Sequence, residues 1–493
     1  MRLKLTAGAV FILFLCAAGF SQSPADEPAV TTPVDKPAPV APVDEPKNDR
    51  SRNVNIDMQV VYGQYNNMLS TINLSHEQEK SVYLLSSYFK RSNDFGYNGS
   101  LFENSSFNEN RIGYTGNFNP ADSWKSILEA EVNNDSRGMF DNQSYSREEK
   151  DKARISIKNI SKISSSFEGY VTVGGAEYRH RLNGIGGTDS ERSTLNHMTG
   201  EIGGEYIWSA SNRVRGNALG GYYVYQGDIP SDRYFSGELI DDFNITPNIG
   251  LSFGVNVDVN RDEKPLAFPI VGVTLKGFQY TTFSLLYRCD LAPFRPEEFY
   301  LEQKYIMPTY DLPPGRVHHG DARLEVRVND SVSIKAGVVV ENNDNFYNYK
   351  VTAGNVLSAE TIEATTCASH LDSRFFLFEK VLEISLRYEY NYFIASQHIT
   401  YRPRQNFGSA VRYNGKIWRF EWSNRLAGKV YTDPDGDEDL SGALIGTLGL
   451  QRQMLESFYA YVRVENLYNA RYNLREGYPE PGITFLGGLR ILI

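Results

Sequence analysis

The stretch Leu251-Ser252-Phe253-Gly254-Val255-Asn256-Val257-Asp258-Val259 decides the fold class. Its odd positions are apolar and its even positions are small or polar, which is the period of a β-strand with two different faces. The same alternation recurs over residues 382–392 and 418–422. The chain is therefore predicted to be all-β, although alternation alone fits both a soluble sandwich and a barrel in lipid.

The spacing of the breaks between strands favours the barrel. Short turns that alternate with long loops are typical of an outer-membrane barrel, with the turns in the periplasm and the loops outside. Tight breaks are predicted at 119–123, 159–165, 209–212, 245–248, 276–279, 328–331, 414–416 and 453–457, and long loops at 92–107, 135–150, 179–193, 291–316 and 430–440. We therefore predict a transmembrane antiparallel β-barrel of about 22 strands over residues 53–493.

Aromatic residues support the same prediction. They make up 13% of the chain, and the four tryptophans, Trp124, Trp208, Trp418 and Trp422, all lie close to predicted tight breaks. Such rings gather at a membrane interface, so we expect an inner belt there. A formal charge of -10 argues against nucleic acid as a partner.

The first fifty residues differ from the rest. Residues 1–21 have the basic, apolar and small-residue regions of a secretory signal peptide. Residues 22–52 are rich in proline and acidic side chains and predict an extended periplasmic linker. No later apolar stretch is long enough for a membrane-spanning helix. After removal of the signal, Cys289 and Cys367 are expected to be unpaired thiols rather than a disulfide.

Both ends of the barrel segment resemble the TonB-dependent outer-membrane receptor family. The resemblance rests on residues 464–472, 477–482 and 485–490 at the end and on residues 60–66 and 86–97 at the start. It implies an outer-membrane location in a Gram-negative-type bacterium and uptake of solutes. Partners would be outer-membrane lipid and the barrel-assembly machinery, which is expected to read the last strand through Phe485, Leu489, Ile491 and Ile493.

One departure from the family bears on function. Family members carry a globular plug before the first barrel strand, whereas here only the short linker precedes it. Val30-Thr31-Thr32 resembles the motif for the energy-transducing partner only weakly. A plug or TonB-like protein supplied by another chain, loops folded inward and a porin-like open lumen all remain as hypotheses.

Two groups of side chains are candidate sites. The loop with Asp433, Asp435, Asp437 and Asp439 offers carboxylates that suit Ca²⁺, against the alternative of a solvated acidic loop. Alternation predicts that a set of charged side chains faces the lumen, because an Arg in mid-membrane lipid costs about 2–4 kcal/mol. This set is Arg323, Glu325, Arg327, Arg419, Glu421, Arg425, Arg463 and Glu465.

No motif for catalysis is recognised. Nucleophile-elbow, metalloprotease and phosphate-loop patterns are not found, so no enzymatic activity is predicted. His318 and His319 are adjacent and should point to opposite sides of a strand, which disfavours a shared metal. The sequence predicts a barrel for transport or uptake of solutes. The alternative is a surface ligand-binding or scaffold barrel without transport.

Overall fold

The structure is a computed structural model of the chain. It describes residues 54–97, 100–186, 189–209, 211–226, 231–260, 264–277, 280–292, 304–308, 312, 315–328, 331–352 and 355–493. The predicted signal peptide and linker lie outside these residues. Among the residues described, no helix is long and apolar enough to cross a membrane.

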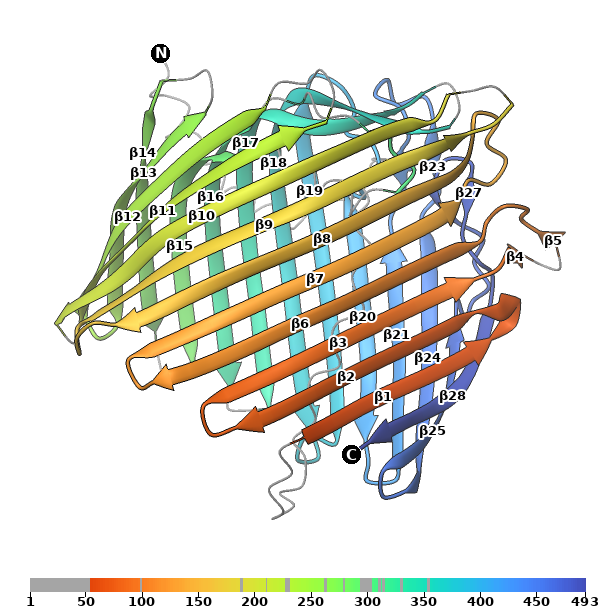
Figure 1. The fold of residues 1–493 in the computed structure, drawn as a ribbon, viewed down its shortest axis with the longest axis horizontal. Coiled ribbons are helices and arrows are strands. Elements are labelled where there is room, and N and C mark those ends of the chain that lie inside the picture. Colours follow the sequence, from red (N-terminus) through yellow and green to blue (C-terminus); the bar gives the residue numbers. More distant parts are fainter. Residues whose placement is uncertain are drawn as a thin grey trace, which may run out of the picture.

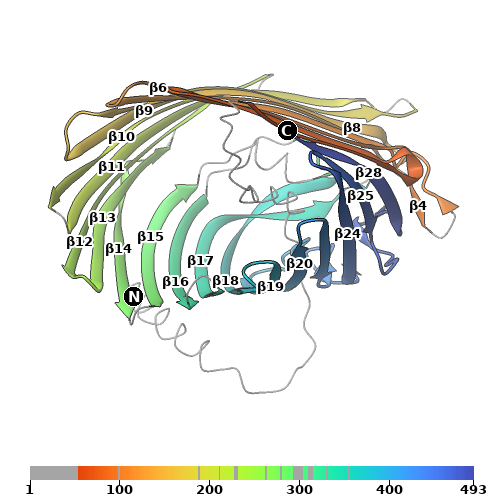
Figure 2. The ribbon, with the colours of Figure 1, turned by 90° about the horizontal axis from the view of Figure 1, so that it is seen from below.

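Within this part of the chain, 22 long strands form one closed antiparallel barrel (Figures 1 and 2). Each strand pairs with the next along the chain, and β28 pairs back to β1, which confirms the predicted class and strand number. The wall strands are β1 (Val54–Gly63), β2 (Met68–Gln78), β3 (Ser81–Ser92), β6 (Phe107–Ala121), β7 (Trp124–Gly138), β8 (Tyr145–Lys162), β9 (Phe167–Gly184), β10 (Glu191–Ser209), β11 (Asn212–Tyr225), β12 (Asp232–Thr246), β13 (Ile249–Asn260), β14 (Leu266–Gly277), β15 (Thr281–Ala292), β16 (Gly315–Val328), β17 (Val332–Val351), β18 (Leu357–Leu377), β19 (Leu382–Ala395), β20 (Gln405–Asn414), β21 (Trp418–Ala427), β24 (Ala443–Leu455), β25 (Phe458–Glu465) and β28 (Thr484–Leu492).

The remaining elements are short and lie in the connections. They are η1 (Gln64–Asn66), β4 (Gly96–Tyr97), β5 (Ser100–Leu101), β22 (Val430–Tyr431), β23 (Asp439–Leu440), β26 (Asn473–Arg475) and β27 (Tyr478–Pro479).

The outer face of the barrel is apolar, as alternation predicts. On β13, Phe253 and Val255 are 46% and 38% exposed, whereas the neighbouring Asn256 and Asp258 are buried. All four tryptophans are exposed large side chains near turns. An exposed apolar surface on a closed barrel is the surface that lipid covers.

The predicted tight breaks all coincide with observed strand ends, but two predicted long loops are partly wrong. Strand β7 continues to Gly138 and β8 begins at Tyr145, so most of 135–150 is strand. The same holds for 179–193, where β9 ends at Gly184 and β10 begins at Glu191. Polar and charged residues on both faces hid these extensions, since a hairpin that rises out of lipid no longer needs an apolar face.

The barrel closes through side chains as well as backbone. Arg490 on β28 donates two hydrogen bonds to the carboxylate of Asp57 on β1, at 2.9 Å and 2.8 Å. Ile493 also exchanges backbone hydrogen bonds with Ile56, each of 2.9 Å. The first and last strands are therefore fastened together near the chain terminus.

Candidate functional site

The loop-side mouth of the barrel is crossed by a segment of the β15–β16 connection, residues 304–308. Ile306 is fully buried and forms a parallel bridge with Leu357 at the start of β18. The backbone of Leu357 donates to the Tyr305 carbonyl at 2.8 Å and accepts from Met307 at 2.7 Å. The segment thus adds a short strand-like contact inside the mouth.

A buried carboxylate on the opposite wall holds this segment. Glu148 of β8 is 2% exposed, and its two oxygens accept the backbone N–H groups of Tyr305 at 2.8 Å and Ile306 at 3.2 Å. Lys150 lies 3.0 Å and His180 3.1 Å from the same carboxylate. A buried carboxylate is tolerated only with such partners. We call Glu148 with the Tyr305 and Ile306 amides the cap latch.

Aromatic packing joins further connections to the cap latch. The rings of Tyr305 and Tyr478 are stacked, with centroids 3.7 Å apart and planes 8° apart. The Tyr478 hydroxyl donates to the Asn355 carbonyl at 3.0 Å and accepts from the Asn142 side chain at 2.9 Å. Four separate connections between wall strands therefore meet at one place.

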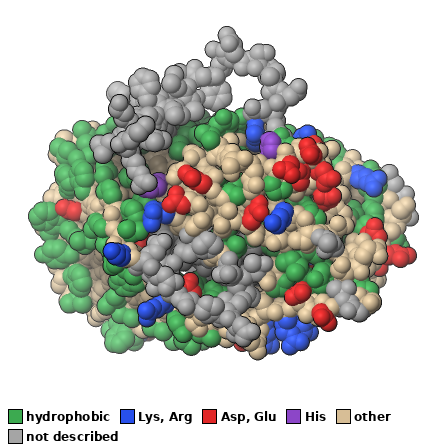
Figure 3. Space-filling view, turned by 90° about the horizontal axis from the view of Figure 1, so that it is seen from above, with side chains coloured by type: hydrophobic (Ala, Val, Ile, Leu, Met, Phe, Trp, Pro, Cys, Tyr) green, Lys and Arg blue, Asp and Glu red, His purple; other side chains and the backbone are tan. Residues whose placement is uncertain are grey.

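The largest apolar core of the described residues also lies at this end. It combines wall residues with the crossing segment and with one residue of the β19–β20 connection, Tyr401. The members are Tyr178, Leu195, Tyr223, Tyr225, Tyr234, Ile306, Tyr349, Leu357, Ala359 and Tyr401. Seen from the loop side, Asp and Glu side chains are scattered over the face and gather mainly on one side (Figure 3). We refer to the cap latch, the Tyr305–Tyr478 stack and this core as the cap.

The closing motif of the sequence forms a turn that supports the cap. Asn466 follows β25 with φ of 48° and is 4% exposed. Its amide nitrogen donates to the carbonyls of Ala470 at 2.8 Å and Pro481 at 2.9 Å, and its oxygen accepts the Ala470 N–H at 2.9 Å. This one side chain fixes both ends of the connection that carries Tyr478.

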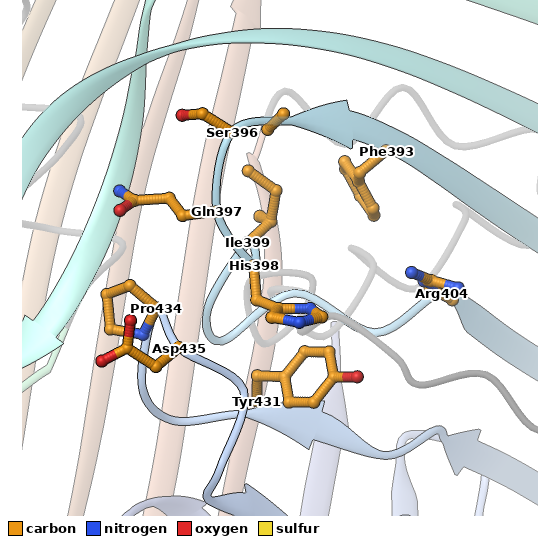
Figure 4. Close-up of a pocket in the computed structure, with 10 residues that line it drawn as sticks. Phe393, Ser396, Gln397, His398, Ile399, Arg404, Tyr431, Pro434 and Asp435 are labelled. Carbon is orange, nitrogen blue, oxygen red and sulfur yellow. The ribbon is translucent and has the colours of Figure 1, made fainter.

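A pocket of about 400 Å³ lies beside the cap, between the β19–β20 connection and the β22–β23 hairpin. His398 and Tyr431 form its floor, with ring centroids 4.2 Å apart. Arg404 lies on one side of these rings and Asp435 on the other (Figure 4). The pocket therefore offers aromatic surface between a cationic and an anionic side chain.

The acidic loop is held by its own backbone. The carboxylate of Asp433 accepts the N–H groups of Asp435, Gly436, Asp437 and Glu438 at 2.7–3.3 Å. Asp439 instead pairs with Lys429 at 2.6 Å. Among the described residues no group of three or more His, Cys, Asp or Glu side chains is placed to hold a metal. The structure thus does not gather the predicted Ca²⁺ ligands, and calcium binding stays a prediction.

The stability of the turn around Asp433 should depend on pH. Partial burial raises the pKa of Asp433, but the four N–H donors lower it by more, so the net pKa lies below its usual value. A lowered pKa stabilises the turn above the unfolded pKa of about 4, and that stability is lost as pH falls through the folded pKa. We expect the protection factors of the amides of residues 435–438, which compare their exchange with that of the unfolded chain at the same pH, to fall below about pH 4. Asp433→Asn should show the lower protection factors at neutral pH, whereas terbium luminescence sensitised by Tyr431 would indicate a cation site instead.

The structure places the predicted lumen-facing charges on the strand faces opposite the exposed apolar residues. On β16, for example, Leu324 and Val328 are exposed on the lipid side of the wall. Most of the eight charges have partners on the lumen side. The closest contacts are Arg327–Glu325 at 2.9 Å, Arg463–Glu465 at 2.9 Å, Glu421–Arg412 at 3.0 Å, Arg323 with Asp321, and Arg419 over the Tyr459 ring at 5.4 Å; Arg425 lies on the same face of β21 as Arg419 and Glu421.

The other candidate ligands are separated. His318 hydrogen-bonds with the Tyr287 hydroxyl at 3.1 Å, whereas His319 lies 3.0 Å from Glu341. Cys289 and Cys367 lie on β15 and β18 and do not form a disulfide with each other.

Closed antiparallel topology, an apolar exterior, and short turns at one end with long connections at the other define an outer-membrane β-barrel. Solved structures that this chain resembles include a transporter and receptors. The copper transporter OprC matches with a TM-score of 0.69 at 11% identity, covering 89% of this chain and 80% of that one. The siderophore receptor PiuA from Acinetobacter baumannii matches at 0.69 and 9%, covering 89% and 82%.

The ferric-catecholate import receptor Fiu from E. coli K12 matches at 0.68 and 10%, covering 90% of this chain and 82% of that one. At such identities the likeness establishes the fold, and it agrees with the resemblance seen at both ends of the barrel segment. No family model and no curated protein matches the sequence.

Proposed function

We propose that this chain is an outer-membrane uptake barrel whose outer mouth is closed by its own cap. The observation that carries the proposal is the cap latch, in which a buried wall carboxylate binds backbone N–H groups of a connection more than 150 positions away. A connection that served only to join two strands would have no need of this contact. Of the three hypotheses for the lumen, inward-folded loops thus have direct support.

Opening of the cap would let solutes enter the barrel. Release of Tyr305 and Ile306 from Glu148 breaks a few hydrogen bonds and leaves the barrel wall intact, because none of them belongs to the wall ladder. Each such bond to a charged group is worth about 1.5–3 kcal/mol, a range that ligand binding can offset. Energy or occlusion from the periplasmic side would come from a plug or TonB-like protein in trans.

Conductance of the purified barrel tests this proposal. The full chain and a variant with residues 304–308 replaced by a Gly-Ser segment of equal length are compared in planar bilayers in KCl and by arabinose swelling of liposomes. We expect the native chain to be nearly silent and the variant to conduct at least tenfold more. A folded variant with the same low conductance and arabinose permeability as the native chain would show that no path runs through the barrel.

The pocket beside the cap favours a second function, ligand binding at the surface without transport. Its aromatic floor and opposite charges suit a ligand with both an apolar ring or chain and polar groups. Deletion of residues 432–438 would abolish surface binding of such a ligand while leaving arabinose permeability unchanged.

A further inference from the structure

Among the described wall strands, the backbone ladder between β14 and β15 stops halfway. Strands β14 and β15 pair from Gly277↔Thr281 only as far as Val271↔Tyr287. On their other edges both strands continue, β14 with β13 to Leu266 and β15 with β16 to Ala292. The two strands therefore both extend to the loop side, but apart from each other. Pro269 lies just beyond the last pair, and proline has no N–H with which to continue a ladder.

The separated halves overlap instead of leaving an opening. Ile270 is on the lumen face of β14 and Cys289 on the outward face of β15, yet they are only 2% and 0% exposed. The Phe268 ring of β14 lies 6.3 Å from the His318 ring of β16, one strand beyond β15. Figure 2 shows β15 set inward of β14. We call this place, defined by Phe268, Ile270 and Cys289, the lapped seam.

A side chain from a third strand takes the place of the missing ladder. The Asn256 amide of β13 donates to the Cys289 carbonyl at 3.3 Å, the Asp290 carboxylate at 3.0 Å and the Asp258 carboxylate at 2.7 Å. Arg288 in turn donates to Asp290 at 2.8 Å. The lumen side of the lapped seam thus carries both signs of charge, while its interior is apolar.

The level of the lapped seam places it beside lipid. Pro269 pairs with Val255 on β13, and Val255 is 38% exposed on the outer face. Parting β14 from β15 here breaks no backbone ladder bond and only the side-chain hydrogen bonds of Asn256, whereas each ladder bond elsewhere contributes about 1 kcal/mol. The lapped seam therefore parts more easily than a continuous ladder of the described strands.

We propose that the lapped seam is a lateral binding crevice for an amphiphile with one acyl chain and a zwitterionic head, taken from the surrounding leaflet. The chain lies between Ile270 and Cys289, and the head takes the place of the Asn256 amide beside the Arg288–Asp290 pair. The mixed charges match a head that carries both signs, and the apolar interior matches an alkyl chain. This goes beyond solute uptake and rests on the proposed function only for the membrane location.

Photo-crosslinking tests the proposal. The full chain is reconstituted in phosphatidylcholine vesicles with lysophosphatidylcholine that carries a diazirine in its acyl chain, and adducts are mapped by mass spectrometry. We expect adducts on the buried residues 268–270 and 288–290. Asn256→Ala should raise their yield at least threefold, and Pro269→Val, which restores a ladder donor, should lower it at least fivefold. Ser252→Ala, a lumen-side change on β13 below the lapped seam, is the matched control and should leave the yield unchanged.

Adducts confined to outward-facing residues such as Val255 and Leu285 would overturn the proposal, because they report ordinary lipid contact. A second readout guards against misfolding. Cys289 should react with N-ethylmaleimide faster in Asn256→Ala, while Cys367, on the continuous β18–β19 ladder, should keep its rate. Failure of the conductance test would leave the adduct pattern unchanged, so the two proposals fail separately.

Discussion

Replacing Glu148 by alanine is expected to open the cap and raise KCl conductance at least tenfold over the native chain. The substitution removes the acceptor for the Tyr305 and Ile306 N–H groups and the carboxylate that lies 3.0 Å from the buried Lys150. Each hydrogen bond to a charged group is worth about 1.5–3 kcal/mol. Because the two amide contacts join the cap to the wall, their loss should fall on cap closure, whereas Lys150 lies on the same strand as Glu148 and the wall ladders of β8 stay intact.

The neighbouring Glu149→Ala is the matched control. Its side chain is 35% exposed and lies 3.7 Å from Arg181, an exposed pair of little energetic weight. Glu148→Gln, which keeps one acceptor oxygen, should give intermediate conductance. If Glu148→Ala migrates as a folded barrel and stays silent, the cap latch does not control the mouth.

Asn466→Ala is expected to disorder the final connection and to release Tyr478 from its stack with Tyr305. The change leaves two carbonyls and one N–H near Ala470 and Pro481 without partners, and it places alanine at φ of 48°. A buried unsatisfied polar group costs about 1–3 kcal/mol. The combined cost for the two carbonyls and the N–H therefore exceeds the stability of a turn at the surface. Amide exchange over residues 470–482 should rise by at least a hundredfold.

Two conservative variants separate the causes. Asn466→Gly tolerates the positive φ but lacks the hydrogen bonds, and Asn466→Asp keeps the acceptor but loses both donors. Because we attribute the effect to the lost hydrogen bonds, we expect amide exchange over residues 470–482 to be nearly as fast in Asn466→Gly as in Asn466→Ala. Exchange in Asn466→Gly equal to that of the native chain would show that backbone strain, and not the hydrogen bonds, decides the effect.

The sequence predicted the barrel well because its signals are local. Alternation in residues such as 251–259 and the short turns follow from the strand period and from lipid on one side. The long hairpins of β7–β10 were missed because strands that rise out of lipid carry polar residues on both faces, as the successive residues Glu148 and Glu149 of β8 show.

The cap could not be predicted for a different reason. Glu148 and Tyr305 are joined by contacts between residues 157 positions apart, and neither lies in a recognisable pattern. Pro269 did carry a signal, since proline inside a strand limits pairing, but its meaning required knowing which strand lies beside it. The predicted acidic site was visible in the sequence, but the structure does not gather it as a metal site. The carboxylate oxygens of Asp433 accept hydrogen bonds from the loop's own amides.

The fastening of β1 to β28 has a consequence for biogenesis. Arg490 and Asp57 are 433 positions apart, so the contact that completes the cylinder joins residues from opposite ends of synthesis. Because of loop-closure entropy, such a contact is slow to form, and it stabilises the barrel only once β28 is in place. Before that moment the nascent sheet has two unpaired edges that invite aggregation. Pairing of β1 with β28 removes both edges at once, so the sheet is free of exposed edges only when these two strands meet.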